Sequence, residues 1–322
     1  MAPTMLTGLS MNPGFNTYID GLHAVLTHKG WLNCPKYALN GMTAMSFRFT
    51  VNRRLTAESA TCYNWMAEHF VAADLLGVLT SQNAGFHFQP TFPLYQEHAI
   101  HSLKQAVRND TGALIWKDGF VVVAGFDDER EVLFYSDGSG ELRELPFSQF
   151  GRNVSPYWYY QLYEDMGEIN RFEIYKESLL QAINKWESHD IMLPESEYAC
   201  GRAAYAAMGE ALKNGDFDTS GGAETIRHYA VSKQDSAKYV RMLADVWPLL
   251  EGAVHAFDQA ADGWSRMVRV LEDSPNRQHI SDPMKLFPLL MESRNWEDEG
   301  IQRIRSFLSE DVHNRFEQIG LR

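Results

Sequence analysis

The chain has 322 residues, 45% hydrophobic and 22% charged, which is the composition of a soluble globular protein with room for one large domain or two ordinary ones. Most of its net charge of −13 lies in residues 156–322, which carry 28 acidic and 18 basic side chains. This acidity argues against nucleic acid and anionic membranes as partners, and no apolar run approaches the about 20 residues of a membrane span.

The three cysteines, Cys34, Cys62 and Cys200, are far apart in the sequence and form no C-x-x-C motif. Their spacing therefore favours neither a zinc site nor a redox pair. The N-terminus has no basic residue and no sustained apolar core, so it is not typical of a secretory signal. We expect a cytoplasmic protein with reduced thiols and without a metal or other cofactor.

The first half of the chain mixes helical and strand patterns. In chain order, apolar spacing and breaker residues predict a helix at 16–29, a strand at 44–51, helices at 56–76 and 96–108, a strand at 112–116, a hairpin at 120–136 and an aromatic strand at 157–163. The expected inner stripe of the 56–76 helix consists of Trp65, Met66, Phe70 and Ala73. Pro90 and Pro93 limit any strand that follows Gly85.

After residue 168 the apolar residues recur at helical spacing. We expect helices at 168–186, 195–213, 232–271 and 284–308. Pro248 should kink or split the third of them. The change of period predicts an α+β domain with a small antiparallel sheet at 1–165, and an all-α helical bundle without strands at 166–322.

Several patterns carry a resemblance to a known family. They are the hairpin Phe120-Val-Val-Val-Ala-Gly-Phe-Asp-Asp128 with Glu131-Val-Leu-Phe-Tyr-Ser-Asp137, the leading helix, Gly41-Met-Thr-Ala-Met-Ser-Phe-Arg-Phe49, Asp137-Gly-Ser-Gly-Glu-Leu-Arg-Glu-Leu-Pro-Phe147 and Gly201-Arg-Ala-Ala-Tyr205. They resemble papain-like cysteine peptidases of the bacteriocin-processing type and the N-terminal domain of the butirosin-biosynthesis acyltransferase. The resemblance implies a bacterial protein with a papain-like domain before the helical bundle.

In that family a His opens the first hairpin strand, an Asp ends the second, and the nucleophile begins the leading helix. The resemblance places the Asp at Asp137, but the position of the His is Gly119, and 16–21 contain no cysteine. A triad without an imidazole has no general base for its nucleophile. The resemblance therefore implies a degenerate or altered catalytic centre.

Cys34 offers an alternative nucleophile, because Pro35 suits the first turn of a short helix that would end by Gly41. Asp137 and a displaced histidine would complete such a centre. Candidate histidines are His87, which lies between two phenylalanines, and His98 and His101. The last two share a helix face and could also bind a metal, although no third ligand is evident.

Arg48 is expected on a strand whose flanking residues, Phe47 and Phe49, point the other way. It either grips a carboxylate, in a ligand or in Asp137, or lies exposed on the polar face of the sheet. Ser220-Gly-Gly222 either cradles an anion or forms a plain loop. The candidate ligand-binding residues are Arg48, Gly119, Trp65 and His87.

Three functions follow as expectations. The first is a papain-like protein with a degenerate centre that binds a small molecule or peptide in the cleft between helix and hairpin, in a bacterial biosynthetic pathway. The second is an active cysteine-dependent acyltransferase or amidohydrolase that uses Cys34. The third is an interaction protein that forms a homo-oligomer through its helical domain.

Overall fold

The computed structural model describes residues 3–14 and 16–318 of the chain. It divides into two compact units, each discontinuous in sequence. Unit 1 comprises Met1–Leu39 and His69–Ile169, and unit 2 comprises Asn40–Glu68 and Asn170–Arg322. The segment Asn40–Glu68, which the sequence reading places in the first domain, thus belongs to the unit that contains the bundle helices.

Unit 1 is a mixed α and β structure. Its elements are β1 (Thr4–Met5), α1 (Thr17–His28), β3 (Val78–Phe86), α4 (Phe92–Arg108), β4 (Ala113–Trp116), β5 (Phe120–Asp127), β6 (Val132–Ser136), β7 (Arg143–Pro146) and β8 (Tyr157–Met166). The strands form one antiparallel sheet in the order β3-β8-β4-β5-β6-β7, with β1 paired to β5. The predicted small antiparallel sheet with helices is confirmed.

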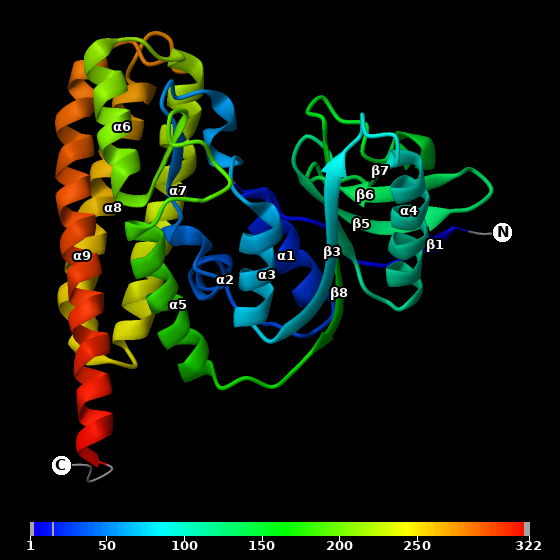
Figure 1. Ribbon diagram of the computed structural model, residues 1–322, viewed down its shortest axis with the longest axis horizontal. Coiled ribbons are helices and arrows are strands. Elements are labelled where there is room, and N and C mark those ends of the chain that lie inside the picture. The colour runs from blue at the N-terminus through cyan, green and yellow to red at the C-terminus, as the bar shows by residue number, and fades with distance from the viewer. Residues whose placement is uncertain (1–2, 15, 319–322) are drawn as a thin grey trace. The chain divides into compact units, whose positions relative to one another are not determined.

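Helices α1 and α4 cover opposite faces of this sheet (Figure 1). Helix α1 lies so close to its face of the sheet that Gly21 has no room for a side chain. A Cβ at Gly21 would lie 2.3 Å from Cδ2 of Leu114 on β4. On the α4 face, Trp158 of β8 contacts Tyr95 with ring centroids 5.3 Å apart. Strand β5 is buried along its whole length, which explains its unbroken apolar run.

The nine-residue strand β3 is a difference from the sequence reading, which assigns no strand before Gly85. Its middle, Thr80-Ser-Gln-Asn83, has low strand propensity. Pairing with the aromatic strand β8 over the whole of β3 supplies the stabilisation that propensity does not. Helix α4 also begins earlier than expected, at Phe92, because Pro93 is tolerated in a first helical turn.

Unit 2 is mostly helical. Its elements are β2 (Thr50–Asn52), α5 (Arg171–Glu187), β9 (Tyr198–Cys200), α6 (Gly201–Asn214), α7 (Thr219–Ala244), α8 (Glu251–Glu272) and α9 (Pro283–Gln318), with 3-10 turns at Met45–Phe47, Ala57–Ala60 and Pro248–Leu250. Helices α2 (Lys36–Met42) and α3 (Trp65–Leu75) each span a boundary between the units. The break at Pro248 is as expected, since α7 and α8 lie on either side of it.

The predicted strand at 44–51 is wrong for most of its length. Ala44 has a positive φ of 56° and the chain then turns through Met45–Phe47, so that only Thr50–Asn52 is a strand. This strand pairs with β9, which contradicts the expectation of no strand after residue 168. Buried ring contacts hold the segment in unit 2. The centroid of Phe49 lies 4.6 Å from that of Tyr229 and 5.4 Å from that of Trp264.

The predicted 56–76 helix is also divided, into the turn at Ala57–Ala60 and α3. Two residues of its expected inner stripe are on the outside, with Met66 39% and Phe70 55% exposed. His69 and Ala72 are fully buried instead, together with the correctly predicted Ala73. In the part of the chain that the structure describes, no helix is long and apolar enough to cross a membrane.

Candidate functional site

The start of β5 lies at the N-terminus of α1, where the resemblance places the catalytic centre. Asn16 caps α1 by accepting the backbone N–H of Ile19 at 3.3 Å. The backbone N–H of Phe120 donates to Oγ1 of Thr17 at 3.1 Å. Gly119, the residue before Phe120, is therefore beside the helix terminus, as expected of the position that would hold the histidine.

Aromatic side chains fill the interior next to this helix terminus. The ring of Tyr18 stacks on His69 with centroids 3.5 Å apart, and Phe120 packs edge-on against Tyr18 and Tyr159 at 5.7 Å. All four side chains are buried. We call Tyr18, His69, Phe120 and Tyr159 the aromatic cluster; none of them is a nucleophile of the kind that papain-like chemistry needs.

His69 is a buried imidazole that the sequence reading does not single out. Its Nδ1 lies 2.9 Å from the hydroxyl of Tyr159, which itself donates to Oε1 of Gln82 at 2.7 Å. Because a hydroxyl has one proton to give, Nδ1 of His69 is the donor to Tyr159. This arrangement fixes the imidazole as part of the packed interior.

Asp137 follows β6 at the same end of the hairpin as Gly119, because Val122 pairs with Ser136. One carboxylate oxygen accepts the backbone N–H of Ser139 at 2.9 Å, and the other lies 2.8 Å from Nε of Arg143. The hydrogen bond from the Ser139 side chain, followed by the backbone bond and the charge of Arg143, lowers the pKa of Asp137. Arg143, and not Arg48, is the arginine that pairs with it.

Cys34 lies in the loop before α2 and is partly exposed. Nε2 of His23 contacts the backbone oxygen of Cys34 at 2.8 Å and must donate to it. Because Nε2 of His23 donates its proton to that carbonyl, this nitrogen is not free to accept a proton from the Cys34 thiol. The helix that follows Cys34 has seven residues, as short as the sequence indicates.

The other candidate histidines lie around α4. The ring of His87 packs against Phe92 with centroids 6.3 Å apart. His98 lines a shallow pocket with Asn83 and Tyr95, and His101 is exposed. Among residues 3–14 and 16–309, whose side chains are described, no group of three or more His, Cys, Asp or Glu is placed to hold a metal ion.

The strongest candidate for a ligand-binding site is a cavity of about 350 Å³ in unit 2, whose wall contains charged, amide, imidazole and thiol side chains. We call it the Arg48 cavity. Its wall comes from the segment around β2, the start of α3, the end of α5 with the loop that follows, and the end of β9. The lining residues are Arg48, Phe49, Thr50, Asn64, Ala67, Glu68, Asn184, Lys185, Ser188, His189, Asp190, Ile191 and Cys200.

Arg48 is held rigidly in this wall. Its guanidinium lies 3.9 Å above the centroid of the Tyr63 ring, and it donates to Oγ1 of Thr50 at 3.3 Å and to the backbone oxygen of Ala60 at 2.6 Å. The side chain is only 6% exposed, which corrects the solvent-exposed alternative. Its Nε is buried and has no hydrogen-bond partner within the described chain.

The acidic side chains of the wall have other partners. Glu68, whose charge acts on Arg48, forms an ion pair with Lys185. Asp190 accepts the backbone N–H groups of Asn64 at 2.8 Å and Met192 at 3.0 Å. No described carboxylate forms an ion pair with Arg48, so the wall holds a buried positive charge without a direct counterion.

Trp65 begins α3 directly after Asn64, and its indole N–H donates to the backbone oxygen of Thr61 at 2.8 Å. Trp65 is therefore near the cavity in sequence but is not part of its wall. Of the residues in this wall, Arg48 could be predicted from the sequence as ligand-binding, but no sequence pattern connects it with the residues of α5 and β9.

Two thiols near this region are expected to react slowly at neutral pH. Burial, as the largest cause, raises the pKa of both Cys62 and Cys200 above the ordinary 9.0. Only about 1% or less of each is then thiolate at pH 7. We expect iodoacetamide alkylation of both, followed by peptide mass spectrometry, to rise about tenfold per pH unit and to level off only above pH 9.0. A plateau below pH 8 would contradict these raised pKa values.

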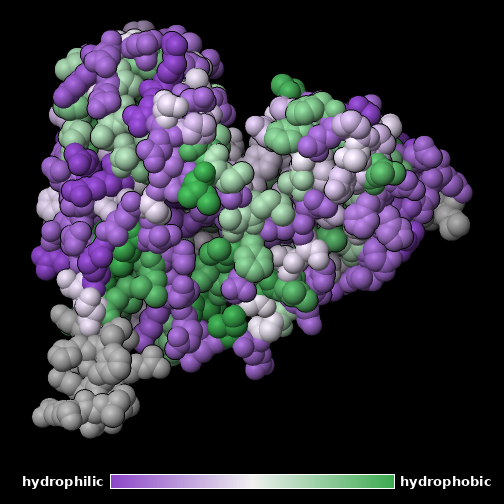
Figure 2. Space-filling view, viewed as in Figure 1, coloured by the Kyte–Doolittle hydropathy of each residue, from purple (hydrophilic) through white to green (hydrophobic). Residues whose placement is uncertain are grey.

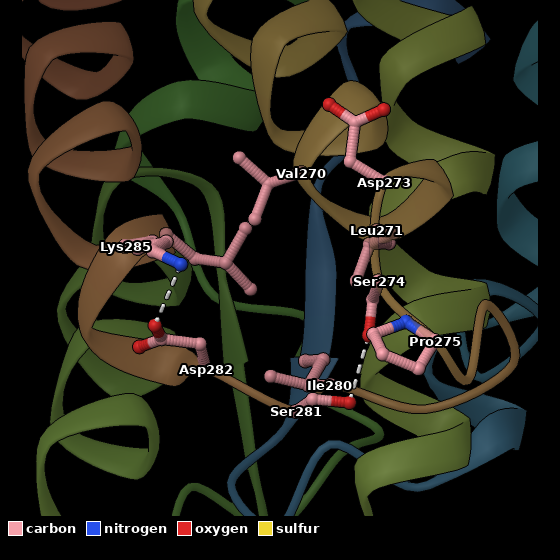
Figure 3. A pocket seen from close by; sticks show the side chains of 10 residues that line it. Val270, Leu271, Asp273, Ser274, Pro275, Ile280, Ser281, Asp282 and Lys285 are labelled. Atoms are coloured by element: carbon pink, nitrogen blue, oxygen red, sulfur yellow. Dashed lines mark hydrogen bonds and ion pairs between the residues drawn. The ribbon is translucent and has the colours of Figure 1, made fainter.

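A second cavity, of about 310 Å³, lies in the loop between α8 and α9 (Figure 3). Ser274 donates to Ser281 at 2.9 Å, and Lys285 pairs with Asp282 at 3.1 Å. Asp273 also lines this cavity, and its carboxylate forms no ion pair with a described residue. The charge left over in this wall is therefore negative.

The Ser220-Gly-Gly222 segment is neither a loop nor an anion cradle but the first turn of α7. The side chain of Asp218 accepts the backbone N–H groups of Ser220 and Gly221, both at 3.0 Å. The acidic cap occupies the donors that an anion would need, and would repel one.

No protein-family model matches the chain, and a search of curated proteins finds no match. The resemblance to papain-like proteins therefore rests on the sequence patterns, and the function has to be argued from the site.

Proposed function

We propose that this chain is a papain-like protein with a degenerate catalytic centre that binds a small molecule and performs no cysteine chemistry. The observation that carries the proposal is the aromatic cluster (Tyr18, His69, Phe120 and Tyr159) beside the N-terminus of α1. A thiol nucleophile needs an accessible position at that terminus and an adjacent base. Here the N-terminus of α1 carries Thr17, whose hydroxyl accepts the backbone N–H of Phe120, and Gly119 stands where the base would be.

The ligand's place is the Arg48 cavity rather than a cleft between helix and hairpin. The expected cleft region is packed with buried rings, whereas the Arg48 cavity combines open volume, polar lining side chains and a buried charge. Ligand pockets in proteins have such a mixture and about 300–1,000 Å³ of volume. A cavity of about 350 Å³ suits a small molecule better than a peptide.

Self-association through the helical unit has less support. Its large exposed apolar side chains come from several helices and loops, and they are Met66, Phe172, Leu180, Ile191, Met192, Val246, Leu249 and Met284. Figure 2 shows many hydrophilic residues on the visible face of the bundle helices. Interfaces of stable oligomers usually bury a contiguous apolar patch.

The relative reactivity of the cysteines tests the proposal. In the wild-type protein at pH 6, we expect iodoacetamide to alkylate Cys34 no faster than an ordinary exposed thiol, and replacement of His23 by Ala to leave that rate within about twofold. The measurement is peptide mass spectrometry, with Cys62 and Cys200 as internal controls.

Fast alkylation of Cys34 at pH 6 that is lost in a single His→Ala variant would instead establish a thiolate–imidazole pair. The chain would then be a cysteine-dependent acyltransferase or amidohydrolase, and the proposal would be wrong.

A further inference from the structure

We propose that the ligand of the Arg48 cavity is a small organic carboxylate whose charge neutralises the Arg48 guanidinium. The inference rests on the proposed function, since it names the chemical class that the same cavity takes. It comes from three observations in unit 2: the burial of Arg48, the state of its neighbours, and the composition of the wall.

The first observation is a buried charge without a direct ion-pair partner among the described residues. An arginine remains protonated at any physiological pH, and burying its charge without a counterion is costly. Arg48 is 6% exposed, and its described partners are the hydroxyls of Thr50 and Tyr229, a backbone oxygen and an aromatic ring, none of which carries a negative charge. A bound carboxylate would supply both the missing negative charge and acceptors for the guanidinium.

The second observation is that the guanidinium is fixed before any ligand arrives. The ring of Tyr63 supports one face, while Thr50 and Ala60 orient the terminal nitrogens. The hydroxyl of Tyr229 beside it also contacts the Thr50 backbone, accepting its N–H at 2.9 Å. A donor group held in this way loses little entropy on binding, so its contact with an anion stabilises the complex efficiently.

The third observation concerns charge and size. Lys185 in the same wall is paired with Glu68, and Asp190 accepts two backbone N–H groups, so Arg48 is the wall's cation without an ion-pair partner among the described residues. One cation matches a monocarboxylate better than a phosphate dianion. The wall also presents amide side chains, Asn64 and Asn184, next to apolar ones such as Ile191. This lining suits a carboxylate attached to a short organic body.

Thermal-shift titration of the full chain tests the inference with defined probes: the monocarboxylates acetate, benzoate and phenylacetate, each matched with its neutral primary amide, and inorganic phosphate. We expect at least one carboxylate to raise the melting temperature while its amide does not. In Arg48→Gln the affinity for that carboxylate should fall at least about tenfold, as for the loss of a charge-assisted hydrogen bond.

Two further variants make the result specific. Arg54→Gln removes a surface arginine, 70% exposed and paired with Asp216, and should leave binding unchanged. Ala67→Trp enlarges a side chain of the cavity wall at an exposed position of α3 that is not itself a partner of Arg48, and should abolish binding even if Arg48→Gln does not fold. Retention of binding in Ala67→Trp would overturn the location of the site.

Each remaining outcome decides a different claim. Equal binding of acids and amides, both blocked by Ala67→Trp, would overturn the carboxylate inference and leave the proposed ligand cavity standing. Displacement of the carboxylates by phosphate at lower concentration would assign the cavity to phosphorylated compounds and overturn the inference. If no probe binds wild-type protein, the carboxylate inference is overturned, whereas the proposed lack of cysteine chemistry is judged by alkylation alone.

Discussion

Replacement of Lys233 by Ala is expected to lower the free energy of unfolding by about 3–5 kcal/mol, because it leaves a buried carboxylate without its counterion. Nζ of Lys233 lies 2.6 Å from Oε1 of Glu297, and the two side chains are 1% and 2% exposed. The hydroxyl of Tyr205 donates to Oε2 of Glu297 at 2.6 Å. Nζ also lies 5.0 Å from the ring centroid of Phe49, so the network supports the segment that carries Arg48.

Urea denaturation followed by tryptophan fluorescence measures this loss, since Trp264 donates to Tyr205 within the same network. Lys238→Ala, an exposed lysine on the same helix α7, is the matched control and should cost less than about 0.5 kcal/mol. Lys233→Met combined with Glu297→Gln removes both charges and should recover most of the stability. A loss below about 1 kcal/mol in Lys233→Ala would show that the pair is not buried in solution.

The second large effect is a gain of reactivity in Thr17→Cys combined with Gly119→His. A thiol at position 17 would lie in the first turn of α1, and a Cβ at position 119 meets no atom within 4 Å. The helix terminus and the new imidazole should together lower the pKa of the introduced thiol into the range of about 3.5–7.5. We expect iodoacetamide to alkylate Cys at position 17 at least about tenfold faster at pH 6 than in Thr17→Cys alone.

The comparison of the double with the single variant isolates the imidazole, because both contain the same thiol at the same helix terminus. Peptide mass spectrometry separates this thiol from the three native cysteines. Equal rates in the two variants would mean that position 119 does not face the terminus of α1. The interpretation of Gly119 as the vacated histidine position would then have no basis.

Elements with a regular apolar period could be predicted from the sequence. The leading helix, the strands β4 and β8 and the hairpin β5–β6 lie within a few residues of their expected positions. In each, local propensity and burial agree, so the pattern of single residues is sufficient.

The strand predicted at 44–51 is wrong because consecutive residues of this segment are all buried, not only every second one. Phe47, Arg48 and Phe49 are all buried, at 3%, 6% and 1% exposure. A half-buried strand cannot produce this, but an irregular segment surrounded by the helices of unit 2 can. The alternation rule therefore predicts a strand with an exposed arginine, whereas long-range packing produces a buried one.

The buried histidine of α3 could have been found. His69, Ala72, Ala73 and Leu76 follow the i, i+3, i+4, i+7 spacing and are all buried. If the helix is assumed to begin at Thr56 instead of Trp65, its inner face is predicted to contain Met66 and Phe70, which are more hydrophobic but exposed. The Arg48 cavity, in contrast, joins residues more than a hundred positions apart, and no pattern in one sequence predicts such a junction.

The most direct test of the account is a cysteine footprint of the wild-type protein at pH 9, with and without the carboxylate that gives the largest thermal shift. Cys200 lines the Arg48 cavity, whereas Cys34 belongs to unit 1 and Cys62 is outside the wall. We predict that the carboxylate slows alkylation of Cys200 and leaves that of Cys34 unchanged. Cys62 is not a control here, because the charge of Arg48 acts on its thiol. Protection of Cys34 instead, with Cys200 unaffected, would contradict this prediction.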